Sequence, residues 1–198
     1  MRTDDADEDA TVLIVDDEEK LADMYTLWLR NDYEIRTVYA GGDIQSALDE
    51  SVDVVLLDRR MPGHSGEQVL GAIRRADRDV SVILVTAVTP DFDVLDLPFD
   101  DYLGKPVQHD DLITAIELQL TARRSGEDLR TYLRLRAKEA ILAQEKNRWE
   151  LEENERFSEL QEKLETLDDK LRGEGEDFEE IIGEFEGINR GPGLARKD

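Results

Sequence analysis

Three short, mostly apolar runs rich in β-branched residues constrain the fold of this chain more than any other feature. They are Thr11–Val15, Asp53–Leu57 and Val80–Val85. Runs that are apolar at nearly every position, rather than at alternate positions, are typical of strands with both faces buried. Such strands occur in parallel sheets whose two faces are covered by helices. We therefore expect these runs to form the centre of a parallel sheet.

Amphipathic segments alternate with the apolar runs. The expected helices are Glu19–Arg30, Asp43–Glu50, Ser65–Arg75 and His109–Thr121, and two weaker strands are expected at Glu34–Tyr39 and Asp101–Leu103. Strand and helix then alternate five times, and each crossover between parallel strands is right-handed. The predicted fold class is therefore α/β, a doubly wound five-stranded parallel sheet of flavodoxin-like order 2-1-3-4-5.

No strand pattern occurs after Thr121, and the rest of the chain is predicted to be mainly helical. Residues 129–171 contain no Gly or Pro, and one stretch has an apolar seam at spacings of 3 and 4, formed by Phe157, Leu160, Leu164, Leu167 and Leu171. The pattern predicts an all-α helical hairpin or coiled-coil module, followed by an amphipathic helix through Phe178–Ile188. The expected organisation is an acidic disordered segment over 1–9, a sheet domain over 10–122, a helical module over 123–190 and a flexible tail over 191–198.

The charge of the chain limits its partners and its surroundings. Asp and Glu total 49 against 25 Lys and Arg, so the net charge is −24, and there is no cysteine. A field of this sign repels nucleic acid and anionic membranes at low salt and is screened at molar salt. The composition resembles that of proteins from salt-accumulating halophiles, with an ordinary acidic protein as the alternative. No apolar run is long enough for a membrane span and no basic, apolar leader is present, so we expect a cytoplasmic location without membrane contact.

Polar residues follow the ends of the predicted strands. Asp16 and Asp17 follow the first strand, Asp58 follows the third, Thr86 ends the fourth and Lys105 follows the fifth. Ligands of open α/β sheets bind beyond the carboxyl ends of the strands, so these side chains should meet at one edge. Three neighbouring carboxylates repel one another unless a cation lies between them, and an oxygen-only ligand set suits Mg²⁺ or Mn²⁺. A divalent ion, a carboxylate nucleophile and a lysine are the groups that phosphoryl acceptance requires.

These residues carry a family resemblance. The segments Val12–Glu18, Val54–Gly63 with Gly66, Thr86-Ala87 and Asp101–Pro106 resemble the motifs of the receiver domain of two-component response regulators, over roughly residues 10–122. The resemblance implies that Asp58 is the phosphoacceptor, assisted by Thr86 and Lys105, and that a sensor histidine kinase is the phosphodonor. It further implies metal binding by Asp16, Asp17, Asp58 and the backbone carbonyl of Arg60, a switch formed by Thr86 and Tyr102, and a cis peptide bond before Pro106.

Simpler interpretations exist for several of these residues. Asp16 and Asp17 could be helix N-cap residues, Thr86 a β-branched strand end and Tyr102 a core aromatic residue. The sequence also departs from the receiver pattern in one place, because only 18 residues separate Thr86 from Lys105 and two of them are prolines. This spacing predicts that the fourth helix is shortened or remodelled, and it makes the usual receiver dimer contact doubtful.

The helical module has a resemblance of its own. Tyr132–Lys146 and Glu159–Leu164 resemble the HalX domain, a small helical module that follows receivers in haloarchaea. Residues 121–148 hold eight basic and four acidic residues, a net charge of +4. These basic residues could bind DNA phosphates or pair with neighbouring acids. The apolar seam could be a homodimer or partner interface, or the core of the module.

The residues and the resemblance lead to one functional prediction. The chain is expected to be a response regulator that accepts a phosphoryl group on Asp58 and transmits the change to the helical module, in transcriptional regulation. It would act on a protein partner or on DNA, with possible homodimerisation through the receiver or the C-terminal helices. It would be a switch with at most slow autodephosphorylation, not a turnover enzyme. The alternatives are an unphosphorylated pseudo-receiver scaffold and an aspartate-nucleophile phosphatase, although Arg60 replaces the second Asp that such hydrolases use.

Overall fold

The computed structural model describes residues 10–39, 44–61, 64–76, 78–173 and 177–191. These residues fall into two compact units, Met1–Thr86 and Ala87–Asp198. The expectations of a disordered segment over 1–9 and of a flexible tail over 191–198 concern residues that, apart from Gly191, lie outside the described ranges.

The strands confirm the predicted topology. They are β1 (Thr11–Val15), β2 (Glu34–Val38), β3 (Val52–Leu57), β6 (Ser81–Thr86) and β7 (Asp101–Gly104). In the described part of the chain they form one five-stranded sheet in the order β2-β1-β3-β6-β7, which is the predicted order 2-1-3-4-5. The pairs β1 with β2, β1 with β3 and β3 with β6 are parallel.

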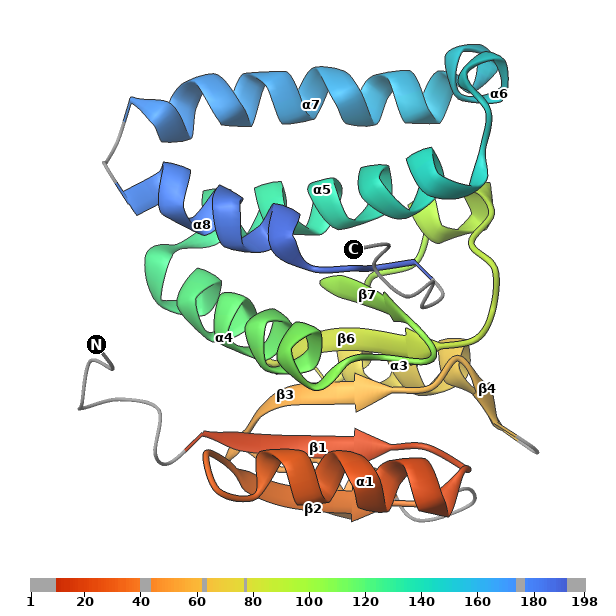
Figure 1. Cartoon of the computed structure of the whole chain (residues 1–198), viewed down its shortest axis with the longest axis vertical. Helices are drawn as coiled ribbons and strands as arrows, with labels where there is room; N and C mark the ends of the chain where they lie inside the picture. Colours follow the sequence, from red (N-terminus) through yellow and green to blue (C-terminus); the bar gives the residue numbers. More distant parts are fainter. Residues whose placement is uncertain (1–9, 40–43, 62–63, 77, 174–176, 192–198) are drawn as a thin grey trace, which may run out of the picture. The chain divides into compact units, whose positions relative to one another are not determined.

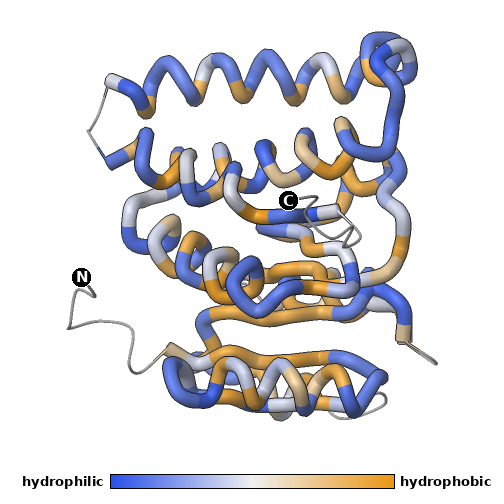
Figure 2. The backbone as a smooth tube through the Cα atoms, in the orientation of Figure 1, coloured by the Kyte–Doolittle hydropathy of each residue, from blue (hydrophilic) through white to orange (hydrophobic). Residues whose placement is uncertain are grey.

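Burial explains why the three apolar runs were the clearest strand signals. Every residue of β1 and β6 is buried, and so is every residue of β3 except Asp53. Strand β2, at the edge of the sheet, is only partly buried, which accounts for its weaker sequence pattern. The hydrophobic colouring of Figure 2 follows the central strands. Val15 is paired with Leu57, and Leu57 with Leu84, so the three strands end close to one level.

Two helices of the first unit cover its strands on opposite faces (Figure 1). Helix α1 (Glu19–Leu29) buries Ala22, Tyr25 and Leu29, and α3 (Gly66–Arg75) buries Val69, Leu70 and Ile73. Helix α2 (Ile44–Ala47) is shorter than the predicted Asp43–Glu50. The sequence did not predict a short antiparallel pair, β4 (Arg60–Met61) with β5 (His64–Ser65), which joins β3 to α3.

The second unit begins with the remodelled segment that the short spacing predicts. In the described residues between β6 and β7 the helical structure is one 3₁₀ turn, η1 (Phe92–Leu95). Because Pro90 and Pro98 flank this turn and lack backbone N–H donors, a full helix is disfavoured there. The remaining helices of this unit are α4 (His109–Ser125), α5 (Glu127–Glu145), α6 (Arg148–Glu153), α7 (Glu155–Arg172) and α8 (Asp177–Gly187).

Helices α5 and α7 form the predicted helical hairpin. They pack side by side, with α6 in the connection between them (Figure 1). The seam residues Phe157, Leu160, Leu164 and Leu171 are buried in this packing within one chain. The structure therefore supports the interpretation of these four residues as the core of the module.

Candidate functional site

Three carboxylates meet at the ends of two neighbouring strands. Asp16 and Asp17 follow β1, and Asp58 follows β3. One carboxylate oxygen from each of the three lies within 4.8 Å of the others. Asp16 and Asp58 are only 2% and 6% exposed, and Asp17 is partly exposed. The structure thus brings together the acidic cluster that the strand ends predicted.

Backbone N–H groups orient two of these carboxylates. The Glu18 N–H donates to Asp16 Oδ1 at 2.9 Å, and the Arg60 N–H donates to Asp58 Oδ1 at 3.0 Å. In both cases the donor lies two residues after the acid, a local turn that Asp forms readily. The backbone at Asp58 is itself tied to the sheet, because its N–H donates to the Val15 carbonyl at 2.9 Å. The nucleophile candidate is therefore held by the strand on one side and by the turn on the other.

The helix-cap interpretation of Asp16 and Asp17 is not supported. Helix α1 begins at Glu19, its N-cap residue is Glu18, and no side-chain hydrogen bond caps it. Neither Asp16 nor Asp17 is therefore the N-cap residue of α1. Their proximity to Asp58 is the better explanation of their position.

The donor set fits a hard divalent cation. All three side chains offer oxygen, and two of the three are buried beside one another, where unscreened like charges are costly. A cation between them removes that cost, and Mg²⁺ and Mn²⁺ prefer such oxygen ligands. Arg60, whose backbone carbonyl is the fourth expected ligand, lies in β4 directly after this turn.

Gly66 is a residue of the site whose role sequence reasoning missed. A Cβ atom built at Gly66 would lie 2.3 Å from the Asp58 carbonyl oxygen and 2.6 Å from the Arg59 Cα. The Gly66 N–H also donates to the Arg59 carbonyl at 3.0 Å. The start of α3 can therefore approach the Asp58 turn only because position 66 has no side chain. The glycine was visible in the sequence, but this close approach involves backbone eight residues away.

The other expected residues take the following places. Thr86 ends β6 and is buried, at the same carboxyl end of its strand as Asp58 is of β3. Tyr102 and Lys105 belong to the second unit, in β7 and just after it, and both are buried. The Tyr102 hydroxyl donates to the Val88 carbonyl, and its ring centroid lies 6.2 Å from that of Phe99. The Lys105–Pro106 peptide bond is cis, as predicted.

Comparison with known families explains this arrangement. The family model of the response regulator receiver domain matches residues 12–117, more than half of the 198-residue chain. The chain belongs to the response regulator receiver family. A second family model, the HalX domain, matches residues 122–187. This response regulator is therefore a receiver followed by a HalX domain.

The response regulator is similar in sequence to proteins of known name. A Haloferax volcanii protein named "Putative transcriptional regulator" is 41% identical over 157 residues, which cover 79% of this chain and 27% of that protein. The sensory transduction protein RegX3 of Mycobacterium tuberculosis is 41% identical over 123 residues, 60% of this chain and 53% of RegX3. The chain thus spans about half, or less, of the curated relatives it matches.

Solved structures confirm the fold of the receiver. The response regulator receiver domain protein from Clostridium thermocellum aligns with a TM-score of 0.52 at 29% identity. The alignment covers 59% of this chain and 98% of that one. In the described part of the response regulator, no helix has the length and apolar character of a membrane span.

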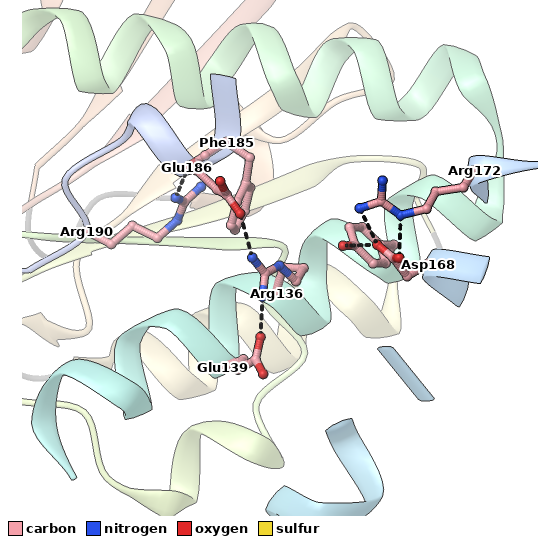
Figure 3. Close-up of polar contacts among 8 residues, drawn as sticks. Arg136, Glu139, Asp168, Arg172, Phe185, Glu186 and Arg190 are labelled. Atoms are coloured by element: carbon pink, nitrogen blue, oxygen red, sulfur yellow. Dashed lines mark hydrogen bonds and ion pairs between the residues drawn. The ribbon is translucent and has the colours of Figure 1, made fainter. Parts of the chain in front are cut away.

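The basic block of the HalX domain makes many ion pairs inside the chain. The closest approaches are Arg134 to Asp100 at 3.0 Å, Arg136 to Glu139 at 2.5 Å and to Glu186 at 3.0 Å, Lys146 to Asp91 at 2.8 Å, and Arg148 to Glu152 at 2.6 Å. Figure 3 shows the guanidinium of Arg136 between Glu139 and Glu186. The pairing interpretation of these basic residues is supported, and several of the partners lie far away in the sequence.

Proposed function

We propose that this response regulator accepts a phosphoryl group on Asp58 from a phosphohistidine of a sensor histidine kinase, and that the HalX domain transmits the resulting change in transcriptional regulation. The observation that carries the proposal is the cluster of Asp16, Asp17 and Asp58, whose oxygens lie within 4.8 Å of one another. The proposed setting is the cytoplasm.

Asp58 is suited to be the nucleophile. Its carboxylate oxygen would attack the phosphorus of the phosphohistidine, a P–O bond would form, and the P–N bond to the imidazole would break. The Arg60 N–H donates to one carboxylate oxygen at 3.0 Å, which helps to orient the carboxylate. Since orientation of the attacking group is a large part of phosphoryl-transfer catalysis, this tether favours reaction.

The neighbouring residues would bind the cation and the phosphoryl group. Asp17, Asp58 and the Arg60 carbonyl would hold Mg²⁺ or Mn²⁺ directly, and Asp16 would hold it through water. The bound ion would neutralise charge on the phosphoryl oxygens. The Thr86 hydroxyl would donate a hydrogen bond to the phosphoryl group, the Lys105 ammonium would pair with it, and Tyr102 would respond to the movement of Thr86.

The same site argues for a switch and against rapid turnover. Aspartate-nucleophile phosphatases use a second acid two residues after the nucleophile, and this position is Arg60, whose N–H already binds Asp58. Without a general acid or base there, hydrolysis of the aspartyl phosphate would be slow. A pseudo-receiver that never accepts a phosphoryl group is the second candidate.

The output is proposed to be a contact with a partner protein. Many basic side chains of the HalX domain are engaged in ion pairs within the chain, so contact with DNA phosphates would require those pairs to open. Contact with DNA and homodimerisation through surfaces other than the buried seam are the alternatives.

Intact-mass measurement tests the proposal. Wild type with Mg²⁺ at molar KCl should gain about 80 Da, one phosphoryl group, on incubation with acetyl phosphate. Asp58→Asn should gain nothing. Asp53→Asn is the matched control, because Asp53 lies in β3, the strand that Asp58 follows, and accepts a hydrogen bond from the Thr11 N–H that an amide oxygen can also accept. Wild type that binds Mg²⁺ without gaining mass would support the pseudo-receiver instead, and size-exclusion analysis of the same samples would report homodimerisation.

A further inference from the structure

The segment that joins β6 to the cis-proline is held by the HalX domain of the same chain. Arg134 of α5 pairs with Asp100, Lys138 of α5 donates to the Leu95 carbonyl at 2.9 Å, and Arg156 of α7 pairs with Asp96. The Lys138 ammonium also lies 5.2 Å from the centroid of the Phe99 ring. Burial lowers the pKa of Lys138 to about 8, as expected for a cation enclosed by packing. The HalX domain therefore covers this part of the receiver.

One contact of this interface is fully buried. Arg190, three residues beyond the HalX family match, is 2% exposed, and its partner Asp101 is 0% exposed. Arg190 Nε donates to Asp101 Oδ1 at 2.8 Å, and its Nη2 donates to Asp101 Oδ2 at 2.9 Å. The remaining Nη1 donates to the Phe185 carbonyl at 2.6 Å, and the guanidinium lies 3.6 Å from the Phe185 ring centroid. Figure 3 shows Arg190 against Phe185.

The backbone around Arg190 is also tied to the receiver. The Gly104 N–H of β7 donates to the Arg190 carbonyl at 3.0 Å, and the Asn189 N–H donates to Asp111 Oδ1 of α4 at 3.2 Å. Residues 189–191, named here the C-terminal latch, thus bind to β7 by backbone and side chain together. Helix α8, which ends at Gly187, is fastened by the same contacts.

Asp101 links the C-terminal latch to the expected switch residue. Its Oδ1 atom accepts hydrogen bonds from two donors, the Arg190 Nε at 2.8 Å and the backbone N–H of Tyr102 at 2.7 Å. Tyr102 also packs on Phe99, which lies under Lys138. A shift of the Tyr102 backbone would therefore act on the buried carboxylate of Asp101, and a movement of its ring would act on Phe99.

We propose that the C-terminal latch, bound to β7, holds α8 of the HalX domain closed against α4, and that phosphorylation releases it by moving Tyr102 and withdrawing Asp101 from Arg190. The release would free the face of α8 that contains Phe178, Ile182 and Phe185. The second half of this proposal rests on the proposed phosphorylation of Asp58, whereas the latch itself does not.

Hydrogen–deuterium exchange of the full chain at molar KCl tests the latch. In Arg190→Gln, amides of residues 177–191 should exchange at least about tenfold faster than in wild type, because a buried Asp101 loses its charge partner. Arg148→Gln is the matched control, since it removes the same charge from an exposed pair with Glu152 in the same domain. Exchange in α1 should stay unchanged in both variants. Equal exchange of α8 in Arg190→Gln and in wild type would overturn the proposal.

A double variant separates the ion pair from a general loss of packing. Asp101→Asn combined with Arg190→Gln leaves no buried charge without a partner, so its α8 should exchange more slowly than the two single effects predict together. Strict additivity of the two substitutions would mean that the pair does not act as a latch.

Phosphorylation tests the coupling. Wild type treated with acetyl phosphate and Mg²⁺, and shown by mass to carry the phosphoryl group, should exchange at α8 about as fast as unphosphorylated Arg190→Gln. Phosphorylation of Arg190→Gln should increase its α8 exchange rate only slightly. A phosphorylated wild type with unchanged α8 exchange overturns the release while the proposed function stands. If wild type never gains the phosphoryl mass, the proposed function is wrong, and so is the release of the latch by phosphorylation. Exchange in the unphosphorylated variants then still tests whether the latch itself exists.

Discussion

At the scale of the residue, the geometry of the site depends as much on a missing side chain as on the acids themselves. Asp58 receives a hydrogen bond from the Arg60 N–H within its own turn, but the start of α3 comes so close that a single carbon at position 66 would collide with the Asp58 carbonyl oxygen. The colliding atoms are backbone, which cannot rotate away as a side chain can. The position of Asp58, the proposed nucleophile, is therefore sensitive to residue 66.

Gly66→Ala is predicted to destabilise the protein by roughly 1–3 kcal/mol, the range for overpacked sites. It should also slow phosphoryl acceptance, because relief of the clash displaces the turn that carries Asp58. Thermal unfolding by circular dichroism and the rate of mass gain with acetyl phosphate measure the two effects.

Gly71→Ala is the control for this substitution, since it lies in the same helix and its Cβ would meet only the far end of the Arg75 side chain at 3.2 Å. Alanine there should be neutral or stabilising by up to about 1 kcal/mol, as in other helix interiors. Equal effects of the two substitutions would contradict the backbone clash at position 66.

At the scale of the element, helix α7 shows how a charged helix is defined at its ends. Only a few apolar residues of α7 are buried, so packing alone does not define where the helix begins, and its N-terminus needs a local capping residue. Asn154 provides it, because its side chain accepts a hydrogen bond from the Phe157 N–H at 3.1 Å. The preceding helix α6 begins in the same way at Asn147, which forms a capping box with Glu150.

Asn154→Ala is predicted to lower the free energy of unfolding by about 1 kcal/mol, the typical value of an N-cap. Asn154→Ser keeps an acceptor at the cap and should cost only a few tenths of that amount. Urea unfolding of both variants at molar KCl, followed by circular dichroism, measures the difference. If serine costs as much as alanine, the cap hydrogen bond is not what stabilises the start of α7.

At the scale of the whole molecule, the net charge of −24 opposes the compact state. Added salt shortens the Debye length from roughly 10 Å at 0.1 M to roughly 3 Å at 1 M, so repulsion between distant acids fades. Exposed ion pairs such as Arg148 with Glu152 weaken as well, but each contributes little. Repulsion should therefore dominate the response to salt.

The thermal midpoint is predicted to rise by several degrees as KCl increases from 0.1 M to about 1 M. A variant in which Glu159, Glu165 and Glu184, three exposed acids, are replaced by Lys should gain less from the same salt, because its net charge falls from −24 to −18 (−24 + 3 × 2). A midpoint that falls with KCl in wild type would show that ion pairs, not repulsion, dominate.

The local sequence pattern was enough to predict the strands, the order of the sheet and the shortened segment before β7. It also predicted the cluster of Asp16, Asp17 and Asp58. The reason is physical: continuous burial, helical spacing and proline act within a few residues, and the parallel topology then places all strand ends at one edge. The roles of Asp58, Thr86, Lys105 and Tyr102 remain predictions from the family resemblance.

Only the tertiary structure showed which elements pack against one another. A seam of apolar residues indicates that one face of α7 is buried, but it does not indicate whether that face packs on α5 or on a second chain. The Arg190–Asp101 pair joins residues 89 positions apart, and the approach of Gly66 to Asp58 joins two backbones. Hydrophobic periodicity predicts which face of an element is buried, but not which other element covers that face. Contacts between residues far apart in the sequence depend on how whole elements pack.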